Sequence, residues 1–554
     1  MVDEVLAEQL GIESVVGTDL TDCEPNAKGL KSWLKELPVT NLDAMVQPVS
    51  QMAKELSQLN VPGKTLLECV EVINGTAFQL MEYLENKFVL RVEGLDSVAT
   101  QAVKVVHSIN QWMIEIYLHA IVDPAVRKKN RVLAVGRAME WLFHYMLRCY
   151  YLYLPVNALI WSRLNRLVLL VHEEELDGMS VEMAGRDQSV VSLTNLYLQS
   201  VVLSSINPSQ LQYQQLKALS FQCPLLASQI QVIFDHNDVD SNALFEVDVN
   251  GARPPIYRNR TEQRTGGYQT IWLLGFSRIV AAVEKKPSAN DEVALKIYNS
   301  LSDSVRHQML RVWTQPPQRN MERIETDVAV ESAIGIDVNF ALRSGGLTAD
   351  GFLNALREKE PLMSGEAAVA NVLHTGRVVN YSEGRGACVR FDKMPESLVS
   401  GAPISIKIRG LWVLGLVRWI RRQGAGVDCG VELVSTECQP CAIRVASEEG
   451  TWGPLSEGML SVRDNSGYSH FALVTAGRVS VNSMGLYLRT EQRRCFVKIT
   501  ETFHLTGLVS ISYFVEVPSD SLPPLAEAGG SQLKVDGPAP SSPDDNDPWR
   551  DVNK

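Results

Sequence analysis

The sequence VVNYSEGRGACVRF, residues 378–391, contains a polar, glycine-rich turn between two short apolar segments. Each flanking segment has the composition of a β-strand, so the stretch predicts a strand, a turn and a second strand. Such a turn is either a plain connection or a cradle for an anion, because glycine lets a ligand approach the backbone N–H groups closely. The rest of the sequence has to decide between these two interpretations.

The length and composition indicate a modular globular protein. The chain has 554 residues, of which 45% are apolar and 21% charged, and its formal net charge is −12. A protein that binds nucleic-acid polymers without sequence preference needs a basic face that displaces counterions from phosphates, and this charge argues against one. A small anionic ligand in a local basic pocket remains compatible with it.

Three features predict a cytoplasmic protein without a transmembrane segment. The N-terminal MVDEVLAEQLGIE carries acidic residues where a secretory signal would carry Lys or Arg. The most membrane-like stretch, Cys149–Ser162, has only 14 residues without a charge, whereas a spanning helix needs about 20. The nine cysteines show no disulfide-scaffold spacing, which is typical of reduced thiols in a cytoplasm.

The apolar pattern divides the first part of the chain into three segments. Residues 1–25 are expected to be flexible, and residues 26–235 have helical spacing of apolar residues, as at Leu30, Trp33 and Leu37. The aromatic stretch WLFHYMLRCYYLYL, residues 141–154, is apolar nearly all round and predicts the central helix of this domain. Residues 236–310 are expected to form a β-hairpin turning at Asn250-Gly251, followed by helices at 269–286 and 291–313.

From residue 311 onward the pattern changes to β-structure. Six short strand-like segments within 311–445 predict an antiparallel β-barrel, with a partly helical insertion at 341–375. A second β-rich domain is expected at 446–518, and residues 519–554 have the Pro, Ser and Asp content of a disordered tail. The fold class is therefore multidomain α+β, with a helical bundle followed by two β domains.

Three features in order carry a family resemblance. QRNMER places Arg319 and Arg323 four residues apart just before the first barrel strand. NYSEGRG supplies Asn380, Ser382 and, one position late, Gly386. Further on, LWVLGLVRWIRRQGAGVDCGVEL has a Gly-x-Val-Arg strand followed by a closing Gly-Val strand. Together these features resemble the PilZ domain family of bacterial cyclic di-GMP receptors.

The resemblance implies the ligand and the residues that bind it. Arg319 and Arg323 are expected to contact the guanine and phosphate of cyclic di-GMP, and a guanidinium suits the O6/N7 edge of guanine. Asn380, Ser382 and Gly386 are expected to supply contacts from the barrel surface. Arg385 stands where the family pattern has glycine, so either the turn is one residue longer or the motif has decayed. Arg385 also adds a cation that can contact a phosphate.

The preferred interpretation is a cytoplasmic bacterial receptor that binds this second messenger and relays the signal to a protein partner through the helical domain. In the family such outputs concern type IV pili, flagellar motility, exopolysaccharide and biofilm formation. We expect no catalytic residues, no metal site and no cofactor other than the cyclic di-GMP ligand. The partner is not identified by the sequence.

Two alternatives remain open. The first is an interaction scaffold whose PilZ domain has lost the nucleotide, which the Arg385 departure favours and the intact arginine pair opposes. The second is a redox protein that uses CQPC, with Cys438 and Cys441, although there is no second CxxC and we expect these cysteines in a loop between the two β domains.

Overall fold

The computed structural model describes most of the chain and divides it into two compact units. The first comprises Met1–Pro208 and Tyr213–Pro317, and the second comprises Ser209–Gln212 and Gln318–Lys554. The described residues are 3–89, 97–184, 189–234, 244–258, 270–314, 322–382, 386–424, 426–447, 451–465, 468–477, 479 and 485–518. The expected disordered tail, 519–554, lies outside these residues. None of the helices that the structure describes is long and apolar enough to cross a membrane.

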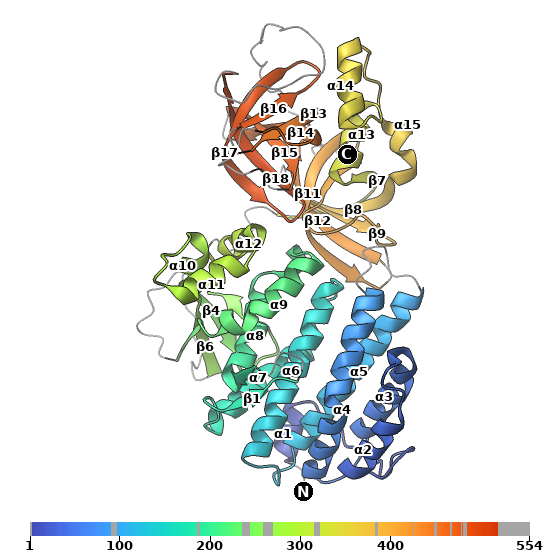
Figure 1. Ribbon diagram of the computed structural model, residues 1–554, viewed down its shortest axis with the longest axis vertical. Coiled ribbons are helices and arrows are strands. Elements are labelled where there is room, and N and C mark those ends of the chain that lie inside the picture. The colour runs from blue at the N-terminus through green and yellow to red at the C-terminus, as the bar shows by residue number, and fades with distance from the viewer. Residues whose placement is uncertain are drawn as a thin grey trace. The chain divides into compact units, whose positions relative to one another are not determined.

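The first unit is mainly helical (Figure 1). Its helices are α1 Glu4–Gln9, α2 Ala27–Glu36, α3 Leu42–Ser57, α4 Gly63–Leu84, η1 Glu85–Val89, α5 Ser97–Ile121, α6 Lys129–Tyr151, α7 Ala158–Glu173, α8 Leu193–Ser205, α9 Tyr213–Ala227, α10 Ser277–Glu284, α11 Glu292–Ser300 and α12 Asp303–Thr314. The short helix η2 Pro208–Gln210 begins at the last residue before Ser209–Gln212, which belongs to the second unit. Several begin at a capping side chain, because an Asn or Ser oxygen satisfies an N–H of the first turn. Asn26, Asn41 and Ser192 cap α2, α3 and α8 in this way.

Helix α6 is buried on nearly all sides, as its aromatic sequence predicts. Trp141 is 0% exposed, stacks on Phe78 with ring centroids 4.1 Å apart, and donates its indole N–H to Asn74 at 2.9 Å. The charged residues of α6 are neutralised in place, since Arg137 pairs with Glu140 at 2.9 Å. The aromatic stretch is therefore core and not a cofactor site.

The N-terminal segment packs onto the helical unit, and the expectation of a flexible arm is wrong for the part that the structure describes. Helix α1 forms behind its cap Asp3, and Leu6 and Leu10 are 4% and 0% exposed. Arg163 in α7 donates to the carbonyl of Leu10 at 2.9 Å. Three leucines of this segment, Leu6, Leu10 and Leu20, are buried, and their burial is enough to dock it although Val5 and Val16 stay exposed.

The small sheet of the first unit has more strands than the sequence predicts. Strands β3 Gln231–Ile233, β4 Leu244–Asp248, β5 Ile256–Tyr257 and β6 Ile271–Gly275 pair in the order β3-β6-β4-β5, and β1 Ser180–Glu182 pairs with β2 Val190–Ser192. The hairpin β4–β5 lies on either side of Asn250-Gly251, as expected. The helix expected at 269–286 is wrong in its first half. IWLLG becomes β6 between β3 and β4, because a short apolar segment fits a doubly buried strand as well as a helix.

The second unit contains two closed six-stranded antiparallel barrels. The strands of the first are β7 Ile324–Ile334, β8 His374–Ser382, β9 Gly386–Phe391, β10 Pro403–Ile408, β11 Leu411–Gln423 and β12 Gly426–Ser435. Their order is β10-β11-β12-β9-β8-β7, and β10 pairs with β7 to close the barrel. This confirms the predicted PilZ-like barrel.

Helices fill the insertion between β7 and β8. They are α13 Ile336–Ser344, α14 Ala349–Glu358, α15 Glu366–Val369 and η4 Ala370–Val372. Thr348 caps α14, and Gly345 ends α13 with φ +79°, a conformation that glycine adopts without strain. Phe340 and Phe352 are both 0% exposed, so these helices belong to the core of the unit.

The second barrel begins earlier than residue 446. Its strands are β13 Cys438–Ala446, β14 Ser456–Asn465, β15 Tyr468–Ala476, β16 Gly485–Arg489, β17 Arg494–Leu505 and β18 Val509–Val517. Cys438 and Cys441 thus lie in the first strand of this barrel and not in an interdomain loop. Pairing with β14 and β16 decides this, because an apolar Cys-x-x-Cys-Ala-Ile segment carries no strand signal of its own.

Candidate ligand site on the first barrel

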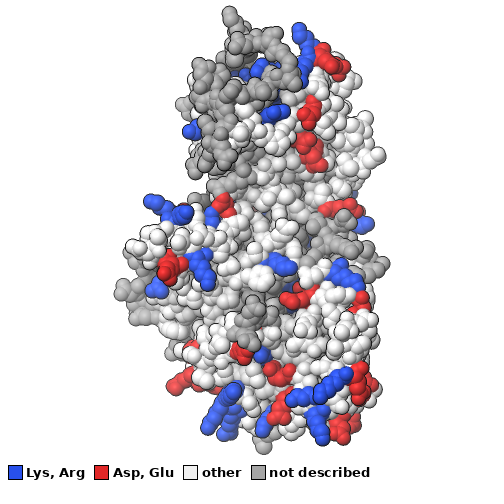
Figure 2. Space-filling model, viewed as in Figure 1, with Lys and Arg blue, Asp and Glu red and all other residues white. Residues whose placement is uncertain are grey.

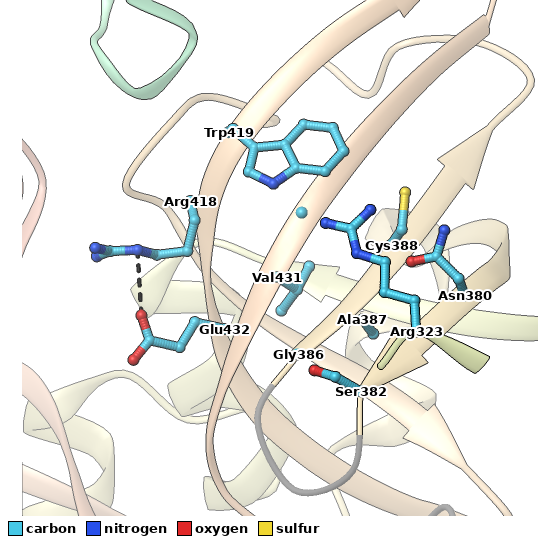
Figure 3. A pocket seen from close by; sticks show the side chains of 11 residues that line it. Arg323, Asn380, Ser382, Gly386, Ala387, Cys388, Arg418, Trp419, Val431 and Glu432 are labelled. Atoms are coloured by element: carbon cyan, nitrogen blue, oxygen red, sulfur yellow. Dashed lines mark ion pairs between the residues drawn. The ribbon is translucent and has the colours of Figure 1, made fainter. Parts of the chain in front are cut away.

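A cavity of about 150 Å³ opens on the outer surface of the first barrel (Figure 3). It lies over neighbouring strands β8, β9, β12 and β11, next to the residue that leads into β7. Its lining comprises Arg323, Asn380, Ser382, Gly386, Ala387, Cys388, Arg418, Trp419, Gly430, Val431 and Glu432. Four of the six predicted residues, Arg323, Asn380, Ser382 and Gly386, are therefore brought together around one space. The other two, Arg319 and Arg385, lie outside the described residues.

An irregularity in β8 aims the predicted polar residues outward. The register between β8 and β9 shifts after Val378, so Asn380 pairs with Cys388. Val378 and Tyr381 are buried at 0% and 3% exposure, whereas Asn380 is half-buried. A β-bulge puts two successive residues on the same side of a strand. Without it, Val378 and Asn380 would face the same way and Asn380 would enter the barrel core.

The turn after β8 keeps glycine at the start of β9. Ser382 pairs with Gly386 across the hairpin. A Cβ atom at Gly386 would lie 3.2 Å from the carbonyl oxygen of Val431 on β12. Glycine at this position therefore allows close strand packing at the rim of the cavity.

A second irregularity, in β11, adds Arg418 and Trp419 to the site. The register against β12 shifts between Val417 and Trp419. Val417 and Ile420 are buried at 1% and 0%, and the two residues between them face outward. The indole lies against the backbone of Gly430, where a Cβ atom would be only 2.0 Å from the indole nitrogen. Glycine on β12 thus makes room for the Trp419 ring.

A larger hollow of about 580 Å³ adjoins the cavity and shares Arg323, Asn380, Cys388 and Trp419 with it. The charged residues of the two spaces together are Arg323, Arg377, Arg390, Arg418, Arg421, Glu325, Asp327, Asp428 and Glu432. Five arginines face four carboxylates here, although the whole chain has a net charge of −12. The site is therefore locally more basic than the protein.

Three of these arginines are engaged with carboxylates. Arg390 makes two hydrogen bonds to Asp428, at 2.6 and 2.8 Å, which raise the pKa of its guanidinium. Arg377 pairs with Asp327, and Arg418 pairs with Glu432 at 3.2 Å. These pairs fix the walls of the site.

Arg323 and Arg421 are different. Within the described part of the chain, neither side chain has an ion pair or a hydrogen bond, and both are exposed. In Figure 3 the Arg323 side chain runs beside Asn380 and Cys388, and its guanidinium points toward the Trp419 side of the cavity. These two cations are available to an anionic ligand.

Four residues of the two spaces were not predicted from the sequence: Trp419, Arg418, Arg421 and Cys388. The signal for Arg418 and Trp419 lies in LVRWI, residues 416–420. These two residues stand between the apolar Val417 and Ile420, where a regular alternating strand would have one outward-facing residue. Burial raises the pKa of the Cys388 thiol to about 11, so this cysteine contributes a neutral surface to the site.

The CQPC cysteines form no reactive pair. Residues three apart on a strand point to opposite faces, and Cys441 packs inside the second barrel while Cys438 packs against its outer side. Burial raises the pKa of the Cys438 thiol to about 11 and raises that of Cys441 as well. A redox pair needs a stabilised thiolate. In addition, no group of three or more His, Cys, Asp or Glu among the described residues is arranged to hold a metal ion.

The face of the molecule in Figure 2 shows Lys and Arg alternating with Asp and Glu. They do not gather into one basic face in this view. At the site on the first barrel, by comparison, five arginines stand with four carboxylates.

Comparison with known proteins matches both units. Residues 28–235 match the family described as the N-terminal domain of the cyclic-di-GMP receptor FimW, and residues 354–440 match the family described as its middle PilZ domain. The chain is a PilZ-domain protein. It is also 20% identical, over an alignment of 489 residues, to the cyclic-di-GMP receptor FimW of Pseudomonas aeruginosa, with 77% of this chain and 80% of that protein covered.

The structure extends the PilZ domain beyond the matched range. Strand β7 and Arg323 precede residue 354, but β7 closes the barrel and Arg323 lines the cavity. The matched range also ends at residue 440, within β13, before most of the second barrel.

Proposed function

We propose that this PilZ-domain protein is a receptor that binds cyclic di-GMP at the cavity of the first barrel and in the adjoining hollow. One observation carries the proposal. Arg323 belongs to the arginine motif, and Asn380, Ser382 and Gly386 belong to the turn motif. The two motifs are at least 57 residues apart along the chain, but these four residues line one cavity.

The chemistry of the site suits this ligand. A guanidinium such as that of Arg323 can make two hydrogen bonds to the O6/N7 edge of guanine. The exposed Arg421 can approach a phosphate in the hollow, and the Trp419 ring offers an apolar face to a base. Asn380 and Ser382 supply neutral donors and acceptors, which satisfy the polar edges of a base without repelling its phosphates.

The volumes of the cavity and of the adjoining hollow indicate which part of the ligand each one can hold. The cavity measures about 150 Å³, whereas a site that encloses a drug-sized ligand measures about 300–1,000 Å³. The cavity is therefore too small for a whole cyclic dinucleotide. We assign one base to the cavity and the rest of the ligand to the hollow of about 580 Å³.

The relay of the signal starts at the arginine motif. The first unit ends at Pro317, and Arg319 and Arg323 follow directly in the chain. A ligand held by these arginines would hold the connecting segment against the barrel and so favour one orientation of the two units. The helical unit would pass this change to a protein partner that controls motility, pili or biofilm formation.

Titration calorimetry with the full chain tests the receptor. Arg323→Ala is expected to weaken cyclic di-GMP binding by about tenfold to a hundredfold, the range for losing one bidentate arginine contact to guanine. The matched control is Arg357→Ala, because Arg357 is an exposed arginine on α14 that lines neither space. Its affinity should equal that of the unmodified chain.

The scaffold alternative gives the opposite result. A chain that has lost the nucleotide would show no heat of binding with cyclic di-GMP at tens of micromolar, whichever variant is used. The cavity favours the receptor over the scaffold because its polar residues remain and no carboxylate among the described residues pairs with Arg323 or Arg421.

A further inference from the structure

The two barrels of the second unit have the same strand connectivity. When the strands of each barrel are numbered 1 to 6 along the chain, the neighbours are 1–2, 2–3, 3–6, 6–5, 5–4 and 4–1 in both. In the first barrel the central 3–6 pair is β9 with β12, and in the second it is β15 with β18. The second barrel thus repeats the topology of the PilZ barrel.

The irregularities between strands 5 and 6 recur, although the shifts between strands 1 and 2 and between strands 2 and 3 occur in the first barrel alone among the described pairs. Strands 5 and 6 show two register shifts in the first barrel, between Leu414 and Gly415 and between Val417 and Trp419. The same pair of strands in the second barrel shows two shifts, between Ile499 and Glu501 and between Thr502 and His504. Bulges are built features of a fold and not accidents, so their recurrence supports two copies of one barrel.

The outer faces of the two 3–6 strand pairs differ in chemistry. In the first barrel this face carries the site, with the cross-strand pairs Gly386–Glu432, Cys388–Gly430 and Arg390–Asp428. In the second barrel the corresponding face has the pairs Ala472–Tyr513, Val474–Ile511 and Ala476–Val509. The polar and charged groups that could hold a nucleotide are replaced there by apolar side chains.

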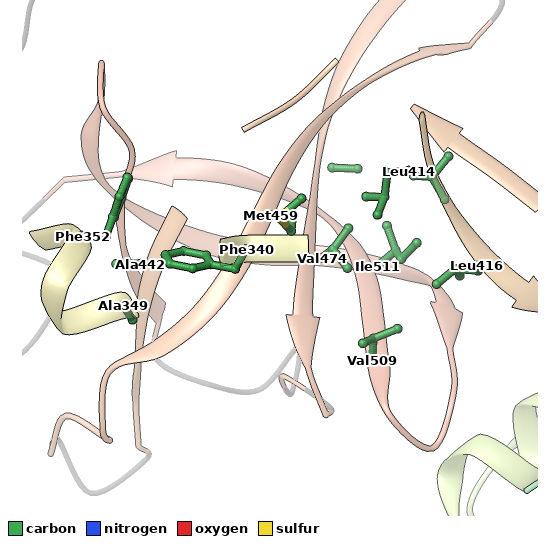
Figure 4. Packing of buried hydrophobic residues seen from close by; sticks show 12 residues of the cluster. Phe340, Ala349, Phe352, Leu414, Leu416, Ala442, Met459, Val474, Val509 and Ile511 are labelled. Carbon is green, nitrogen blue, oxygen red and sulfur yellow. The ribbon is translucent and has the colours of Figure 1, made fainter. Parts of the chain in front are cut away.

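This apolar face is covered by the first barrel and its helices (Figure 4). Val474, Val509 and Ile511 are 0–1% exposed and form one cluster with Leu414 and Leu416 of β11. Phe340 of α13 and Phe352 of α14 complete this cluster, which we call the inter-barrel core. By contrast, Leu473, the neighbour of Val474, packs inside the second barrel.

Strand β11 connects the inter-barrel core to the ligand site. Leu414 and Leu416 lie in the core, and Arg418 and Trp419 follow on the same strand and line the cavity. Displacing the core residues would therefore disturb the bulge that aims Arg418 and Trp419 outward.

We propose that the C-terminal barrel is a second copy of the PilZ fold whose nucleotide face has become a docking face for β11, so that it positions Arg418 and Trp419 and binds no nucleotide itself. The positioning role rests on the proposed function of the first barrel. Val474 and Ile511 are its positioning residues.

The test compares two full-length variants. Val474→Ala with Ile511→Ala removes side chains from the docking face, and Leu473→Ala removes one from the interior of the same barrel. Each variant is assayed for cyclic di-GMP affinity by calorimetry and for hydrogen–deuterium exchange of residues 411–423. The docking-face variant is expected to bind about threefold to tenfold more weakly and to exchange faster in β11, whereas Leu473→Ala should change neither. Ile511→Val, which keeps most of the side chain, should retain the affinity of the unmodified chain.

Several results would overturn the proposal. Unchanged affinity and unchanged β11 exchange in the docking-face variant would do so, as would equal weakening by Leu473→Ala. Undiminished binding in the double variant Arg323→Ala with Asn380→Ala would reveal a nucleotide site elsewhere in the chain. It would refute the claim that the second barrel is a copy that binds no nucleotide. If the unmodified chain bound no cyclic di-GMP, the proposed function would fail and the positioning role with it, while the β11 exchange would still decide whether the docking face holds that strand.

Discussion

Trp419 and Gly430 illustrate how single residues shape the ligand site. The indole occupies the space that a side chain on β12 would need, so the two residues depend on each other. Arg323 depends on no such neighbour among the described residues, which leaves its guanidinium available. At this scale, the site consists of a few polar groups and one ring on a surface that strand pairing has made rigid.

Arg385 is the residue that departs from the family pattern, and its role stays a prediction. Gly386 opens β9 opposite Ser382, a position that favours the longer turn over a decayed motif. Arg385→Gly should therefore remove a cation without repairing anything. We expect binding of cyclic di-GMP to weaken by up to about fivefold and to depend less on salt. Tighter binding, measured by calorimetry at two salt concentrations, would show instead that the motif had decayed.

Cys438 and Cys441 provide a test of the redox alternative. With a pKa of about 11, the Cys438 thiol is ionised to about one part in a thousand at pH 8, and burial also raises the pKa of Cys441. Brief iodoacetamide treatment of the folded protein at pH 8 should leave both unlabelled, as read by mass spectrometry. The denatured protein is the control in which both should react. Rapid labelling of the folded protein would revive the redox interpretation.

At the scale of the elements, a bulge in β8 and another in β11 turn the polar residues and Trp419 outward to form the site. The apolar residues on either side of each bulge, such as Val378 and Tyr381, keep the strand anchored in the barrel core. Helix α14 has a comparable double role, since it fills the insertion and supplies Phe352 to the inter-barrel core.

Phe352→Ala should therefore destabilise the second unit strongly. Its ring is 0% exposed and packs edge-to-face on Phe340, with centroids 5.4 Å apart. Removing a buried phenylalanine costs about 3–5 kcal/mol, which urea unfolding followed by circular dichroism would measure. Arg357→Ala on the same helix should leave the unfolding midpoint unchanged. A small effect of Phe352→Ala would mean that α14 packs loosely.

For the whole molecule, the inter-barrel core changes the domain boundary that the sequence predicts. The sequence places a boundary between residues 445 and 446, but buried residues of both barrels form one cluster. We expect limited proteolysis to yield a protected fragment that contains both barrels, with no cut between β12 and β13. Mass spectrometry of the fragments checks this. Accumulation of a first-barrel fragment ending near Ser435 would show that the two barrels are independent.

The sequence by itself determined the helical unit and the six strands of the PilZ barrel, and the family resemblance of its motifs pointed to four residues that line the cavity. These features have local signals: helical periodicity, strand alternation, and two motifs whose residue types suit guanine and phosphate. Other features lacked such a signal. IWLLG became β6, Cys438 joined a strand, and the N-terminal segment docked on α7, because pairing and burial against distant segments decided each of them.

Only the tertiary structure decided the rest of the site and the relation between the barrels. Trp419 and Arg418 reach the cavity because a bulge interrupts the alternation of β11 against β12. The likeness of the two barrels lies in their strand order and not in a shared motif. The physical reason is the same in each case: a side chain's face depends on strand register, and register depends on hydrogen bonds to residues far away in the sequence.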